Sequence, residues 1–210
     1  MWDGYLGAIK ETIAGSPHMD AEKIDIVVDR FHVAKNCRDA FEHLRKAELR
    51  RLKKELDDTQ YAEVCKGMMW ILRYNHRKLT PEQRQRLRPL FVHSPLLHLA
   101  YTLREEFTAI FDTQFDRETA RLRLTRWMEK VESSVLSCYD KFLTTLRNHF
   151  DPIINYFHRR ANSGFVEGFN NKLRVLTRRC YGIKRLDTLT RRLRLFVRNR
   201  HHQAPPLHHA

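Results

Sequence analysis

The scarcity of glycine and proline is the sequence feature that most constrains the fold. The chain has 210 residues and contains only seven of each. Because these two residue types most often interrupt helices and form tight turns, their scarcity predicts long helices rather than many strands. We therefore expect a mainly α fold.

Apolar periodicity supports this expectation along most of the chain. Trp2 to Ile13 has the pattern of an amphipathic helix, and a second helix is expected from Val33 to about Leu56. Cys37, Phe41 and Leu44 form the apolar stripe of this second helix.

Several later helices have recognisable starts. Residues 80–83 (TPEQ) combine a Thr cap, Pro at the first helical position and Gln three residues after the cap, and Ser94-Pro95 repeats the cap and the proline. Asp151-Pro152 predicts another helix, from Ile153 to about His158. One long helix or two are expected where apolar residues recur on a polar background: Leu124, Trp127, Val131, Val135, Phe142 and Leu146.

The segment Ile24–Val28 (IDIVV) carries the strongest strand signal. It is short and rich in β-branched residues, as in a buried strand. With this strand at the start, we expect a mixed segment over residues 1–36, a helical insertion over 37–150, helical and basic residues over 151–200, and a disordered tail over 201–210.

The charge indicates a polyanionic partner. Lys and Arg number 39 against 25 Asp and Glu, a formal net charge of +14. Nucleic acid is the first candidate and an anionic membrane surface the second. The basic residues are not matched by a strongly apolar face, which disfavours the membrane surface. The four cysteines are scattered without a C-x-x-C pair and indicate reduced thiols in a cytosolic protein.

Glu167 is the first candidate for chemistry. The local interpretation is that it stabilises the first turn of a helix after the cap at residues 162–164. However, Gly164, Gly168 and the amides Asn170 and Asn171 would allow a phosphate to approach closely. A basic stretch then runs from Lys172 to Arg200 and contains Arg174, Arg178, Arg179, Lys184 and Arg185. A carboxylate at the head of such a stretch suits a cation held next to phosphates.

Two further candidates are weaker. Asp29 could bind a hard metal ion and His32 could donate to a phosphate, but Asp29 could equally cap the helix that follows. Trp127 could stack on an unpaired base, although a tryptophan on an apolar seam is more often part of the core.

Two segments together resemble one protein family. IVVDRFHVAK (residues 26–35) and ANSGFVEGFNNKLRVLTRRCYGIKRLDTL (residues 161–189) are similar to the DDE transposases of the bacterial ISL3 insertion-sequence group. The resemblance implies an incomplete ribonuclease-H-like α/β core with a large all-helical insertion. It also implies two magnesium ions held by three acidic residues.

The resemblance assigns roles to individual residues. Glu167 matches the glutamate of the E-G-x-N-N motif, so it is the expected catalytic and metal-binding residue. Asp29, His32 and Asn171 are expected to support it. Trp127 falls where related insertions carry a stacking tryptophan. DNA contacts are expected from Trp127 and from Lys172, Arg174, Arg178, Arg179, Lys184 and Arg185.

The sequence also departs from the family pattern. The resemblance places the first two catalytic aspartates upstream of Met1, and Asp3 lies a few residues too late to be the second. We therefore expect the C-terminal part of a transposase for DNA cleavage and strand transfer, inactive alone. The alternative is a non-catalytic DNA-binding or dimerisation protein. Expected partners are insertion-sequence ends, target DNA, a second copy or an intact transposase, in the bacterial cytoplasm at the nucleoid.

Overall fold

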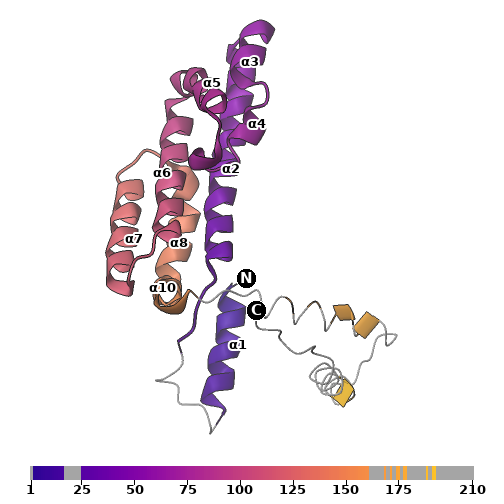
Figure 1. Ribbon diagram of the computed structural model, residues 1–210, viewed down its shortest axis with the longest axis vertical. Helices are drawn as coiled ribbons and strands as arrows, with labels where there is room; N and C mark the ends of the chain where they lie inside the picture. Colours follow the sequence, from indigo (N-terminus) through magenta and orange to yellow (C-terminus); the bar gives the residue numbers. More distant parts are fainter. Residues whose placement is uncertain are drawn as a thin grey trace, which may run out of the picture. The chain divides into compact units, whose positions relative to one another are not determined.

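A computed structural model describes residues 2–16 and 25–160, together with a few single positions between 168 and 192. The chain divides into two units, residues 1–161 and residues 162–210, and each is considered by itself. The described part of the first unit is helical throughout its regular elements (Figure 1). The mainly α expectation is therefore confirmed.

Ten α-helices and two short 3₁₀ helices are found in the described ranges. They are α1 (Trp2–Ala14), α2 (Arg30–Glu55), α3 (Asp58–Cys65), α4 (Met68–Ile71), η2 (His76–Lys78), α5 (Pro81–His93), α6 (Pro95–Asp112), α7 (Arg117–Glu132), η3 (Ser137–Tyr139), α8 (Asp140–Asn148), α9 (Phe150–Ile154) and α10 (Tyr156–Arg159).

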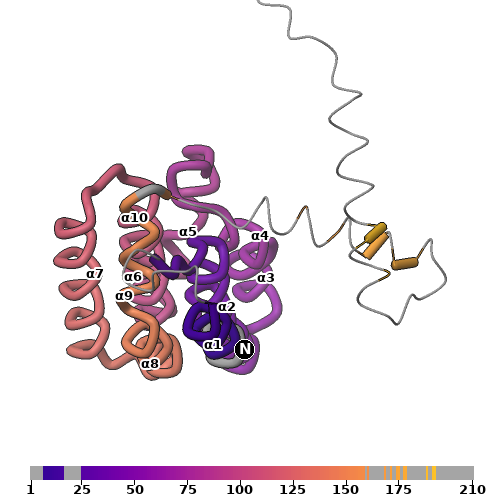
Figure 2. Tube along the Cα trace, turned by 90° about the horizontal axis from the view of Figure 1, so that it is seen from below, coloured from indigo at the N-terminus to yellow at the C-terminus, as the bar shows by residue number. Residues whose placement is uncertain are grey.

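Helix α6 lies at the centre of the packed helices. It packs against both α2 and α7, while α8 contacts α2 (Figures 1 and 2). An aromatic cluster fills the space between α6, α7 and α8: the Phe107 ring centroid lies 4.8 Å from that of Trp127 and 5.2 Å from that of Phe142. Offset and edge-on aromatic contacts of this kind add to the burial of apolar area. The aromatic cluster is one part of a larger core to which helices α2 to α10 all contribute.

The predicted helix starts at residues 80 and 94 are confirmed. The Thr80 hydroxyl accepts from the Gln83 amide at 3.3 Å, and the Gln83 side chain accepts from the Thr80 amide at 3.0 Å, which completes a capping box. Ser94 caps α6 by accepting from the Leu97 amide, and its hydroxyl donates to Glu48 on α2 at 2.6 Å. Ser94 therefore ties the start of α6 to α2.

The predicted strand at Ile24–Val28 is wrong for the residues that the structure describes. Residues 25–29 have no regular secondary structure. The Val28 amide donates to the Pro152 carbonyl at 2.9 Å, and the Asn155 side chain donates to the Ile26 carbonyl at 3.0 Å. A β-branched run becomes a strand only beside a partner strand, and here residues in and after α9 bond to two of its backbone groups instead. The ribonuclease-H-like core stays a prediction, because the described residues contain no sheet.

The predicted seam from Leu124 to Leu146 forms two helices, α7 and α8, rather than one. Val135 does not belong to the seam, because 79% of it is exposed. The break has a local cause: the Ser134 hydroxyl donates to the Val131 carbonyl at 2.6 Å and accepts from the Leu136 amide at 3.3 Å. Serine side chains that bond to nearby backbone in this way compete with continued helix.

Other expectations have mixed outcomes. Helix α1 is confirmed, and the helix expected at residues 153–158 is divided at Asn155 into α9 and α10. Cys37 and Cys65 are buried and Cys138 is partly buried, all as free thiols, while Cys180 lies outside the described residues. No described helix is both long and apolar enough to cross a bilayer. The domain boundaries predicted at residues 36, 150 and 200 stay predictions.

Candidate functional site

The start of α2 holds Asp29 and His32. The Asp29 side chain accepts from the Phe31 amide at 2.9 Å, and its backbone carbonyl accepts from the His32 amide at 3.1 Å. Asp29 therefore caps α2, which is the structural alternative that its sequence position left open. His32 is exposed, and the Phe31 ring packs edge-on to it at 5.8 Å.

Two arginines fix this start to the end of α6. Arg30 Nη1 donates to the Phe111 carbonyl at 3.3 Å, and Arg160 Nη1 donates to the same carbonyl at 3.2 Å. Arg30 also pairs with Asp112 at 2.5 Å, and Arg160 also donates to the Thr113 carbonyl. The last carbonyls of a helix lack intrahelical partners and carry partial negative charge, so two guanidinium groups suit this position.

These contacts bring distant parts of the sequence together. Arg30 lies in the first motif segment, residues 26–35. Arg160 follows α10 directly and precedes the second motif segment, residues 161–189. Together with the Ile26–Asn155 and Val28–Pro152 bonds, the arginines hold the first segment against the residues that lead into the second.

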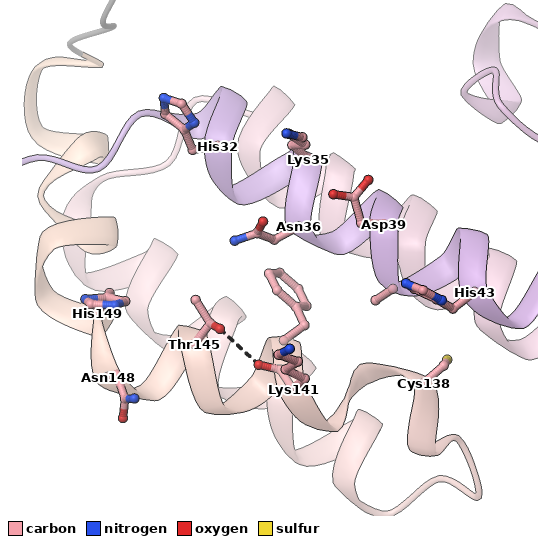
Figure 3. A pocket seen from close by; sticks show the side chains of 12 residues that line it. His32, Lys35, Asn36, Asp39, His43, Cys138, Lys141, Thr145, Asn148 and His149 are labelled. Atoms are coloured by element: carbon pink, nitrogen blue, oxygen red, sulfur yellow. Dashed lines mark hydrogen bonds between the residues drawn. The ribbon is translucent and has the colours of Figure 1, made fainter. Parts of the chain in front are cut away.

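His32 also lines a groove of about 480 Å³ between α2 and α8 (Figure 3). In Figure 3, α2 forms one side, α8 forms the other, and Asn36 points toward α8. The polar lining residues on α2 are His32, Lys35, Asn36, Asp39 and His43, and those after the turn at η3 are Lys141, Thr145, Asn148 and His149.

The groove has the donors that an anion requires. Lys35 and Lys141 are exposed and positively charged, three histidine rings and two amides add further donors, and Asp39 is the one carboxylate in the lining. Phosphate oxygens accept from groups of this kind. The groove is therefore suited to a phosphate-bearing strand.

The remaining predicted site residues fall in the second unit. Asn171, Arg174 and Arg178 are helical and exposed, and Arg174 donates to the Asn171 side chain at 3.5 Å. Glu167, Lys172, Arg179, Lys184 and Arg185 lie outside the described residues. Within the part that the structure describes, no three His, Cys, Asp or Glu side chains are grouped as a metal site would need. The described residues alone therefore do not form the predicted magnesium site.

Trp127 lies in the core rather than on a surface. It is 3% exposed, its Nε1 donates to the Leu103 carbonyl at 2.8 Å, and Phe107 packs on its ring. A base could stack on this indole only if the ring left the core. The apolar neighbours Leu124 and Val131, three and four residues away, are the sequence signal for this burial.

Sequence analysis missed the groove between α2 and α8. Its signal was present on α2, where His32, Lys35, Asp39 and His43 recur at spacings of three and four and so share one helix face. The residues on α8 come from a separate part of the sequence, and only the packing of the two helices brings them together.

Comparisons with known proteins agree with one another. The family model of the ISL3-type DDE transposases, described as a transposase, matches residues 1–193. The transposase of insertion sequence IS1001 from Bordetella parapertussis is 29% identical over 161 residues, which is 76% of this chain and 39% of that protein. The transposase of IS1557 from Mycobacterium tuberculosis is 25% identical over 123 residues, 59% of this chain and 27% of that protein. No solved structure matches.

Proposed function

The chain belongs to the ISL3 family of DDE transposases, and we propose that it takes part in DNA strand cleavage and transfer by supplying Glu167 as a metal-binding carboxylate. The chain spans about two fifths of the length of the IS1001 transposase, 39%. The activity of a whole transposase is therefore part of the proposal. The ribonuclease-H-like core is also proposed, on the basis of the resemblance of residues 26–35 and 161–189 to the family.

The observation that supports this proposal best is the attachment of the α2 start to the end of α6. Arg30 and Arg160 share the Phe111 carbonyl, so the segment with Asp29 and His32 lies beside the residue that leads toward Glu167. The first motif segment is thus fixed next to Arg160, the residue directly before the second motif segment in the sequence.

The supporting residues have different roles in this proposal. Asp29 holds the first turn of α2 through its side-chain oxygen and so positions His32. His32 and the lysines of the groove donate to phosphates of the DNA strand. Lys172, Arg174, Arg178, Arg179, Lys184 and Arg185 hold further phosphates, with strong salt dependence and little base specificity.

Glu167 has the chemistry that a divalent cation requires. A hard dication such as magnesium takes carboxylate oxygens, and when bound it activates an oxygen nucleophile against a phosphodiester. Asn171 follows Glu167 by four residues, a spacing that would place both side chains on one face of a helix. By resemblance, two further carboxylates complete the site.

Metal-dependent DNA binding tests the role of Glu167. The mobility of a labelled DNA duplex is measured with the 210-residue protein and its Glu167→Gln variant, in magnesium and in EDTA at matched ionic strength. We expect magnesium to strengthen binding by the parent protein and to have no such effect on Glu167→Gln. The exposed Glu63 provides a control, since Glu63→Gln removes one charge elsewhere and should behave as the parent.

A second function is favoured by the polar groove between α2 and α8. Its lysine, histidine and amide donors would also suit a protein that binds DNA phosphates without catalysing any reaction. Such a protein would bind DNA equally with and without magnesium, and Glu167→Gln would not change its response. This result would overturn the metal-binding role of Glu167 and leave DNA binding in place. Sedimentation of the same samples measures self-association.

A further inference from the structure

The loop between α3 and α5, together with α5 itself, forms the most basic part of the described helices. Residues 66–88 contain seven Lys and Arg side chains and one acidic side chain, Glu82. All seven cationic residues are exposed: Lys66, Arg73, Arg77, Lys78, Arg84, Arg86 and Arg88. These residues, with Trp70 and Tyr74, are called the basic surface below.

Two large aromatic residues are exposed within the basic surface. Trp70 is 58% exposed and Tyr74 is 51% exposed. The short helix α4 accounts for the first, because Met68 and Ile71 are buried on its inner side and Trp70 is carried to the outer side. The Arg73 guanidinium lies over the indole ring at 5.3 Å from its centroid.

The loop that carries these aromatics is anchored to α6. Arg104, only 4% exposed, donates to the Leu72 carbonyl and to the Tyr74 carbonyl, the latter at 3.2 Å. The His76 amide donates to Glu105 at 2.7 Å. These bonds fix the backbone after Trp70 and on both sides of Tyr74 to one helix, so this part of the loop is ordered without a ligand. Preorganised groups lose less entropy on binding.

Arginines of α5 reach the same loop. Arg86 donates to the Lys66 carbonyl at 2.6 Å, and Arg84 approaches the Arg77 carbonyl at 3.5 Å. Figure 1 shows α4 and α5 toward the same end of the helical unit. Arg84 and Arg86 of α5 therefore lie against the loop that carries the two aromatics.

We propose that the basic surface binds single-stranded DNA, with unpaired bases stacked on Trp70 and Tyr74 and phosphates held by the surrounding arginines and lysines. Stacking on exposed aromatics beside cationic side chains is how proteins hold single strands without reading sequence. Bases in a duplex cannot offer their faces to these rings. The site depends on neither Glu167 nor the groove between α2 and α8, and it goes beyond the proposed function.

Fluorescence anisotropy of the full 210-residue chain tests the site. The probes are a labelled oligothymidine and a labelled duplex of equal length, both in EDTA. We expect Trp70→Ala to weaken oligothymidine binding roughly tenfold and duplex binding less than twofold. Trp70→Phe should recover most of the loss, because the ring face is retained. Leu122→Ala removes an exposed apolar side chain on α7, 49% exposed, and should change neither affinity.

Several outcomes would overturn the site. Unchanged oligothymidine affinity in Trp70→Ala would remove the stacking role, and an equal loss on both probes would indicate phosphate contacts alone. A change from dimer to monomer in sedimentation would assign Trp70 to a protein interface instead. Glu167→Gln should leave oligothymidine binding in EDTA unchanged, so failure of this site and failure of the proposed function can be told apart.

Discussion

Arg104 provides the sharpest test of how the described helices are held together. Its guanidinium is buried between α2, α6 and the loop after α4, where it donates to the Leu72 and Tyr74 carbonyls. It also lies 4.6 Å from the ring centroids of both Phe41 and Tyr101. Arg104→Met keeps a long apolar side chain at this position but removes every donor.

The contacts set the size of the expected loss. A buried carbonyl that loses its partner costs about 1–3 kcal/mol. The bond to Leu72 is buried and the bond to Tyr74 is partly buried, so the two losses cost at most about 6 kcal/mol before any relaxation. The variant no longer has to desolvate a guanidinium, which offsets part of this cost. We expect a net decrease of about 3 kcal/mol in the free energy of unfolding. For a chain of this length that corresponds to a melting temperature lower by roughly 6–12 °C.

Urea unfolding followed by far-UV circular dichroism measures the change. Arg126→Met, at an exposed position of α7, is the matched control and should lose less than about 0.5 kcal/mol. A loss below about 1 kcal/mol for Arg104→Met would refute the reasoning, because it would mean that water or a shifted backbone satisfies the two carbonyls.

Two further predictions concern single side chains of the core. A hydrogen bond from Arg51 lowers the pKa of the Glu48 carboxyl below its ordinary value of 4.5; burial opposes this shift and a hydrogen bond from Ser94 assists it. The ionised Glu48 therefore stabilises the folded state above pH 4.5, and this stabilisation is lost as the pH falls through the lowered pKa of the folded state. Glu48→Gln should therefore lower stability near neutral pH, and urea titrations below pH 4.5 should show the difference from the parent shrinking. Trp127→Phe removes the bond to the Leu103 carbonyl and should cost about 1–3 kcal/mol in urea while oligothymidine affinity stays constant; a selective loss of affinity would instead return Trp127 to a DNA-contacting role.

Helix starts were predictable because their determinants are local. The residues at 80–83 contain both halves of a capping box, and Ser94 with Pro95 repeats half of the same pattern. The strand at Ile24–Val28 was predicted wrongly because a strand depends on a partner that local sequence does not name. Here the turn at α9 provides the hydrogen bonds.

The candidate site was predictable only where it lies in one segment. Asp29 and His32 stood out because they directly follow the predicted strand and lie in the segment 26–35 that resembles the family. The stacking role of Trp127 was inferred from resemblance, whereas burial of its indole depends on packing by α6 and α8. Trp70 was not identified because α4 is too short for a helical repeat of apolar residues to be recognised. The exposure of Trp70 also depends on how the following loop is held against α6, which the local sequence does not reveal.

The bond between Ile26 and Asn155 has a consequence for the order of folding. These residues are 129 positions apart, and closing a flexible loop of that length costs roughly 4 kcal/mol of chain entropy. Contacts between helices that are adjacent in sequence close much shorter loops and can form earlier. The first motif segment should therefore join the residues before the second only after α6 and α7 have packed. Until α9 has formed, the first motif segment has no partner for its backbone hydrogen bonds. Substitutions that destabilise the helical core should therefore also delay or prevent assembly of the site.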